Sequence, residues 1–165
     1  MKKTLVLGIG NKLLSDEGAG LHLLGFLKRT HPDLAEVSYV DGGTLSFTLA
    51  DRIAETDNLI VLDAAELGKS PGSVKSFVGK EMDRFLGKAK RSVHEVGLLD
   101  LMDIARLTTT LPKHRALVGI QPERFDWGQD PSEAVADAIP VAACKVLELI
   151  RLWSAGQEMP AEVAA

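Results

Sequence analysis

Thr4-Leu5-Val6-Leu7-Gly8-Ile9 is a continuous apolar run that Gly10 and Asn11 close. A short apolar run bounded by turn residues is typical of a strand that is buried on both faces of a sheet. The cap-type residues Ser15-Asp16-Glu17 follow, and leucines then recur at helical spacing up to Arg29, before Pro32. The first thirty residues therefore predict a strand, a turn and a helix.

The same alternation of strand and helix continues along the chain. Further strands are expected over Glu36–Asp41, Asn58–Asp63, Ser73–Val78 and Arg115–Ile120. Helices are expected over Leu45–Glu55, within a loop and helix that together cover Ser92–Leu107, and over Pro131–Trp153, where Pro131 suits a first helical turn. Two successive β-α-β units favour a parallel sheet covered by helices. We expect one α/β domain over residues 1–153 and a flexible tail over 154–165.

Composition narrows the classes of function. The 165 residues fit one domain, 45% of them are hydrophobic, and the net charge is −4 without a stripe of lysine and arginine. Nucleic acid and acidic membranes are therefore poor candidate partners. The apolar run near Met1 is too short for a signal peptide or a membrane span, so we expect a cytoplasmic protein. The single cysteine, Cys144, is expected to be a small core residue.

Acidic residues follow three of the predicted strands. Asp16 and Glu17 come after the first strand, and Asp41 and Asp63 end the second and third. Ligands of open α/β sheets bind at the carboxyl ends of parallel strands, so these carboxylates are expected at one edge. Asp16 also suits a helix cap, Glu17 a first helical turn and Asp41 a turn. Asp63 directly follows a buried run, where a charge needs a partner, a metal or a function.

An imidazole adds to this set. His94 precedes a predicted helix and is the best histidine candidate to face the acidic edge, whereas His114, between Lys113 and Arg115, is expected to be solvated. Two carboxylates and one imidazole would make an open site for a divalent transition metal. A dinucleotide loop is disfavoured, because Leu13 replaces the third glycine of the motif and the acids of the helix start would repel a pyrophosphate.

Five blocks of the sequence, in order, resemble the [NiFe]-hydrogenase maturation endopeptidases. The first runs from Gly8 to Gly20 and reads Gly-Ile-Gly-Asn-Lys-Leu-Leu-Ser-Asp-Glu-Gly-Ala-Gly. The others are Asp41-Gly42-Gly43-Thr44, Leu62-Asp63-Ala64, Ser92-Val93-His94-Glu95-Val96-Gly97-Leu98, and Val118-Gly119-Ile120-Gln121-Pro122-Glu123 with Trp127. The similarity extends from about Lys3 to Trp153.

The resemblance implies a three-layer α/β/α fold with a twisted, mostly parallel five-stranded sheet and helices on both faces. It implies that Glu17, Asp63 and His94 contact a metal, and Asp41 and Asp16 are candidate catalytic residues. The implied activity is removal of the C-terminal extension from a nickel-loaded hydrogenase large-subunit precursor. Nickel would come with that precursor, no tightly bound organic cofactor is expected, and a monomer is favoured.

Other functions stay open at this point. A peptidase or amidase with its own resident metal could use the same fold on unrelated peptides. A chaperone without catalytic activity could bind the precursor through the acidic edge and leave its mass unchanged. A nucleotide-binding regulator is the least favoured class, because acids occupy the helix start where a phosphate would bind.

Overall fold

The computed structural model describes residues 1–43, 47–88 and 93–160, and side chains only from residue 97 in the last of these ranges. The strands are β1 Thr4–Ile9, β2 Val37–Gly43, β3 Asn58–Ala64, β4 Val74–Val78 and β5 His114–Ile120. The helices are the 3₁₀ turn η1 Ser15–Gly18, α1 Ala19–Thr30, α2 Leu49–Ala54, α3 Lys80–Lys88, α4 Val93–Leu107 and α5 Glu133–Ser154.

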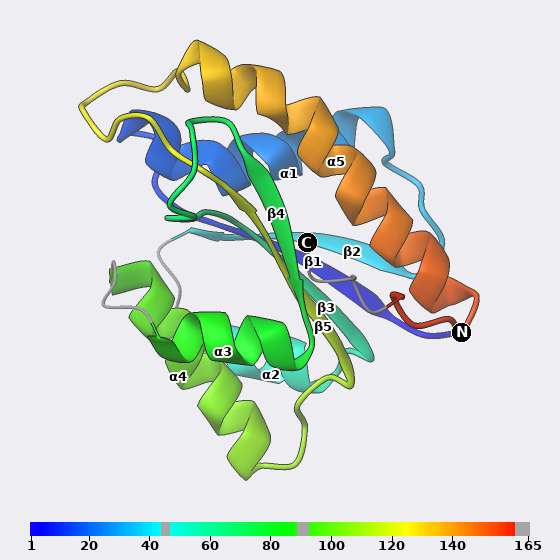
Figure 1. Ribbon diagram of the computed structural model, residues 1–165. Helices are drawn as coiled ribbons and strands as arrows, with labels where there is room; N and C mark the ends of the chain where they lie inside the picture. The colour runs from blue at the N-terminus through cyan, green and yellow to red at the C-terminus, as the bar shows by residue number, and fades with distance from the viewer. Residues whose placement is uncertain (44–46, 89–92, 161–165) are drawn as a thin grey trace.

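The strands form one five-stranded sheet in the order β2-β1-β3-β5-β4. Strands β2, β1, β3 and β5 are parallel, and β4 pairs antiparallel with β5 at one margin. Helices α1 and α5 cover one face of the sheet, and α2, α3 and α4 cover the other (Figure 1). The predicted three-layer α/β/α fold is confirmed, with one antiparallel pair in an otherwise parallel sheet.

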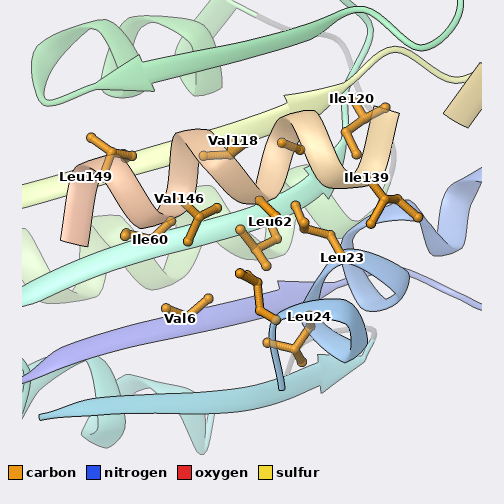
Figure 2. Close-up of a cluster of buried hydrophobic side chains, with 14 of the residues drawn as sticks. Val6, Leu23, Leu24, Ile60, Leu62, Val118, Ile120, Ile139, Val146 and Leu149 are labelled. Carbon is orange, nitrogen blue, oxygen red and sulfur yellow. The ribbon is translucent and has the colours of Figure 1, made fainter. Parts of the chain in front are cut away.

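Each central strand feeds two cores, because successive side chains point to opposite faces. On β3, Ile60 and Leu62 join the core under α1 and α5, whereas Leu59 and Val61 join the core under α2, α3 and α4. Figure 2 shows the first core, with side chains of α1 and α5 directed onto those of the strands. Burial on both faces explains why these strands read as continuous apolar runs.

Two helices begin later than the sequence-based expectation. Helix α2 begins at Leu49, since Phe47 and Thr48 form a turn; Leu45 lies outside the described residues. Helix α5 begins at Glu133, because the Ser132 side chain caps it by accepting a hydrogen bond from the Val135 N–H at 3.4 Å. The expected place of Pro131 in the first helical turn is therefore wrong.

Helix α3 was not expected from the sequence. It spans nine residues, and only two of its side chains, Met82 and Leu86, are buried. Its apolar residues Met82, Phe85 and Leu86 do recur at helical spacing, but they are only three in a short and mostly polar segment, so they give a weak signal for a helix.

Two predictions about single residues are wrong. Cys144 is exposed, because buried residues of α5 recur at helical spacing through Ala142, Ala143 and Val146 and leave position 144 on the outer side. His114 is only 8% exposed and lies against Trp153, with ring centroids 5.4 Å apart. Burial, with Lys2 and Lys113 nearby, lowers the pKa of His114 below its usual value.

The segment after α5 is described as far as residue 160. Met159 packs against the core under α1 and α5, and the Glu158 carboxylate lies 3.7 Å from the Lys113 ammonium. The rest of the expected tail, residues 161–165, lies outside the described residues. Within the described ranges, no helix has the length and apolar character needed to cross a membrane.

Candidate functional site

The parallel strands bring three acidic segments to one edge of the sheet. We call the edge at which β1, β2, β3 and β5 end the carboxyl edge, and the opposite one the amino edge. Glu17 lies in η1 just after β1, Asp41 lies on β2, and Asp63 lies at the end of β3. Strand order changes direction between β1 and β3. Such switch points are where open α/β sheets bind ligands, and Glu17 and Asp63 come from the two strands that flank it.

Two glycines let the Glu17 segment approach the strand ends. Gly10 has a φ of +135°, and a Cβ on it would lie 2.2 Å from the backbone oxygen of Glu17. A Cβ on Gly20 would lie 2.2 Å from the backbone oxygen of Leu62. Neither position accepts a larger residue without moving backbone. The glycine-rich loop therefore folds the acidic turn directly over the ends of β1 and β3.

Asp63 is a buried carboxylate, only 4% exposed. Its neighbours Leu62 and Ala64 pack in the core under α1 and α5, so strand alternation directs Asp63 to the opposite face. That face is covered by α2, α3 and α4 (Figure 1). Helix α4 begins at Val93, which puts His94 in the first turn of a helix on the same face as the Asp63 side chain.

The described side chains do not test the predicted metal set as a whole. The His94 side chain lies outside them, and no group of three histidine, cysteine, aspartate or glutamate residues among the described ones is arranged to hold a metal ion. Glu17 is half-buried and Asp63 is buried, and both lie on segments that end at the switch point.

Asp41 is exposed at the end of β2, and its Oδ1 accepts a hydrogen bond from the Gly43 N–H at 2.9 Å. Gly43 has a φ of +50°, so Asp41 stabilises a turn that needs glycine. Thr44 lies outside the described residues. Asp41 thus combines the expected turn role with access to solvent at the carboxyl edge.

Asp16 does not cap the first helix, contrary to one expectation. Its side chain is fully buried and joins the turn after β1 to the segment between β5 and α5. The Oδ2 atom accepts from the Glu123 N–H at 2.8 Å, the Arg124 N–H at 3.1 Å and the Ser132 hydroxyl at 2.8 Å. The Oδ1 atom accepts from the Ser132 N–H at 2.7 Å.

These bonds fix the ionisation of Asp16. Burial raises the pKa of the carboxyl, but the hydrogen bonds from Ser132, Glu123 and Arg124 outweigh it and bring the pKa below its usual value. The anion is therefore the stable form, and both of its oxygens are occupied. This geometry gives Asp16 a positioning role next to Glu17 and leaves it no oxygen aimed at a substrate.

Backbone pairing joins the same two segments. The Ser15 N–H donates to Gly128 O at 2.8 Å, the Gly128 N–H donates to Leu13 O at 2.9 Å, and the Asp16 N–H donates to Arg124 O at 3.2 Å. The Ser15 hydroxyl also donates to Asp126 O at 2.7 Å. Ser15 holds a φ of +48°, an uncommon backbone conformation for a residue other than glycine and one often found at functional sites.

Two further residues of this edge, Ser132 and Gln121, were not predicted as site residues. Gln121 is buried after β5; its Oε1 accepts from the Leu67 N–H at 2.6 Å and its Nε2 donates to Glu66 at 3.1 Å. It therefore holds the loop after β3 against the end of β5. The available signal was a polar residue directly after an apolar strand, the same signal that marked Asp63.

The chain is similar to known hydrogenase maturation proteins. Residues 21–149 match the family described as hydrogenase maturation protease. The chain is 37% identical over 147 residues to the hydrogenase expression/formation protein HupD of Thiocapsa roseopersicina, covering 88% of this chain and 66% of that relative, or about two thirds of its length. It is 34% identical to the hydrogenase 2 maturation protease of Escherichia coli, covering 90% and 91%.

A solved structure shares the fold over nearly the whole chain. The hydrogenase maturating endopeptidase HybD from Escherichia coli superimposes with a TM-score of 0.85 at 32% identity, covering 90% of this chain and 92% of that one.

Proposed function

The chain belongs to the hydrogenase maturation protease family, a family of peptidases, and from that premise we propose that it cuts the C-terminal extension from a nickel-loaded [NiFe]-hydrogenase large-subunit precursor. The observation that carries the proposal is the meeting of the Glu17 and Asp63 segments at the switch point of the sheet. The precursor is the partner, and nickel arrives as part of it.

In this proposal Glu17, Asp63 and His94 contact the nickel of the precursor. Two carboxylates and an imidazole are suitable ligands for a divalent transition metal, and three protein ligands leave positions for other groups. A precursor without nickel would then lack the ion that these side chains recognise. The enzyme would thereby cut only large subunits that have received their metal.

The role of the metal in bond cleavage is a separate question. A metal ion can polarise a carbonyl, activate water or orient the substrate. Asp41, which is exposed beside these segments, is our candidate for acid or base catalysis. Its position supports that role, because a group that exchanges a proton with substrate must be reachable at the site. A cytoplasmic location, a monomer and the lack of a tightly bound organic cofactor stay predictions.

The test is the mass of a large-subunit precursor before and after incubation with the protein, with nickel-free precursor in parallel. Loss of a short C-terminal peptide from the nickel-loaded form alone is the expected result. Cleavage of both forms would support the peptidase activity and refute the recognition of nickel. Binding without any change of mass would refute the proposed activity and favour a chaperone.

A further inference from the structure

Exposed apolar side chains gather at the carboxyl edge. Among the described residues, the large hydrophobic side chains that are exposed at this edge follow β1, β2 and β5: Leu13, Phe47, Phe125 and Trp127. Trp127 is 80% exposed, Phe125 56% and Leu13 49%. Single exposed apolar residues are ordinary, but several in neighbouring segments mark a contact surface.

Leu13, Phe125 and Trp127 lie on segments that are bonded to each other. We define the two-loop platform as residues 11–18 and 121–132, which run side by side next to the start of α1 in Figure 1. Their backbones pair at Leu13 and Gly128, and Asp16 accepts hydrogen bonds from the second segment. The aromatic residues are therefore displayed on a fixed backbone rather than on an isolated loop.

A fixed apolar surface suits the binding of another protein. Tryptophan is among the residues that contribute most to protein interfaces, and ordering the surface in advance lowers the entropic cost of binding. The charges close by are mixed, since Arg124 and Asp126 pair at 3.4 Å. Attraction to one sign of charge is thus a poor explanation of this surface, and burial of apolar area is the better one.

The position of the platform indicates its occupant. Glu17 is itself part of the platform, four residues after Leu13, so a polypeptide bound at Glu17 has these apolar side chains on the neighbouring surface. We propose that the two-loop platform docks an apolar segment of the large-subunit precursor through Leu13, Phe125 and Trp127, next to the bond that is cut. This inference rests on the proposed function and adds the surface that selects the substrate.

The experiment compares single variants in cleavage of the nickel-loaded precursor. Trp127→Ala is expected to raise KM about 10- to 100-fold with a much smaller change in kcat, because a central interface tryptophan has an effect of that order. Phe125→Ala should have a smaller effect in the same direction. Trp127→Phe, which keeps an apolar ring, should recover much of the loss.

Leu107→Ala is the matched control. Leu107 is 85% exposed and ends α4, the helix that leads into β5 at the amino edge, so its removal should change neither KM nor kcat. Unfolding temperatures of all four variants should equal that of the parent protein, since these side chains are largely in solvent. An unchanged KM for Trp127→Ala and Phe125→Ala, with normal cleavage by the parent, would overturn the docking surface and leave the proposed function intact.

A binding measurement separates the two proposals if the parent protein does not cleave. Precursor captured by the parent but not by Trp127→Ala would keep the docking surface while the proposed activity fails. Equal capture by both, or capture by neither, would overturn the surface. Sedimentation of the protein alone tests the remaining possible occupant, a second copy of the chain. A dimer that Trp127→Ala dissociates would assign the surface to that second copy and overturn the docking of the precursor.

Discussion

The carboxyl and amino edges of the sheet both bury polar side chains, but they use them differently. At the amino edge, the Asn58 amide donates to the Thr4 hydroxyl at 3.0 Å, and His114 packs on Trp153. At the carboxyl edge, Asp16 gathers hydrogen bonds from a distant segment, and carboxylates lie beside exposed apolar side chains. The polar side chains at the amino edge make these contacts within the fold, whereas the carboxyl edge presents charged and apolar groups together.

Cavities of about 340 and 330 Å³ open at the amino edge, around Thr56 and between Lys2 and His114. Neither is lined by Glu17, Asp41 or Asp63. These two cavities therefore belong to the amino edge, and the proposed site is identified instead by acids at a switch point next to exposed aromatic residues.

The largest expected effect comes from neutralising the carboxylates of the site. Glu17→Gln and Asp63→Asn should each slow removal of the precursor tail by more than about 100-fold, because loss of even an outer partner of a metal ligand costs about 10- to 100-fold. Asp57→Asn is the matched control at the amino edge, where Asp57 accepts a hydrogen bond from the Lys3 N–H. Normal cleavage by both site variants would refute their role, as would an equal loss in the control.

Removing one buried polar side chain at each edge compares what the two edges contribute to the free energy of unfolding. Asp16→Ala should lower the free energy of unfolding by about 3–5 kcal/mol, because three backbone N–H groups and one hydroxyl lose their acceptor. Asn58→Ala, which breaks one bond to Thr4, should cost about 1–2 kcal/mol. Urea unfolding of both variants measures the difference. Equal losses would mean that Asp16 has no special part in holding the carboxyl edge.

A low pH should lower the free energy of unfolding through His114, which lies at the amino edge. Its pKa is lowered in the folded protein from a usual value of 6.5, so the unfolded chain binds more protons below that pH. Stability should therefore fall as the pH drops below about 6.5, by less than the effect of Asp16→Ala. His114→Gln should flatten this part of the curve in urea titrations between pH 5 and 7.5. His22, whose pKa burial also lowers, should account for a residual slope. An identical slope in parent and variant would contradict the assignment.

The smallest effect is expected on the outer side of α5, away from both edges. Cys144→Ser should change the free energy of unfolding by less than about 0.5 kcal/mol, because Cys144 is exposed. Val146→Ala, on the buried side of the same helix, should cost about 2 kcal/mol. Thermal unfolding of the pair checks this contrast, and a large loss for Cys144→Ser would show that the residue is packed.

The sequence was most informative for the strands that are buried on both faces. Strand β1 matches its predicted span and β3 and β5 match within one residue at one end, because apolar runs between turn residues mark strands covered on both faces. The site was harder to predict. The sequence shows that acidic residues follow the strands, but it does not show the partners of Asp16. An aspartate that caps a helix and one that accepts hydrogen bonds from a distant segment cannot be told apart from the sequence alone. The prediction that Cys144 is buried was wrong for a related reason: apolar neighbours in the sequence do not show which side of a helix is buried.

The bonds made by Asp16 also set the order in which the protein becomes competent. Its partners Glu123 and Ser132 lie 107 and 116 residues further along the chain. Contacts between such distant residues form late, because a long loop must close first. The turn that carries Glu17 is synthesised near the start, yet its hydrogen bonds to the second segment can form only when β5 and the beginning of α5 have joined the fold. A growing or partly folded chain thus carries the acidic residues without these bonds, and we expect the proposed activity to begin only when they have formed.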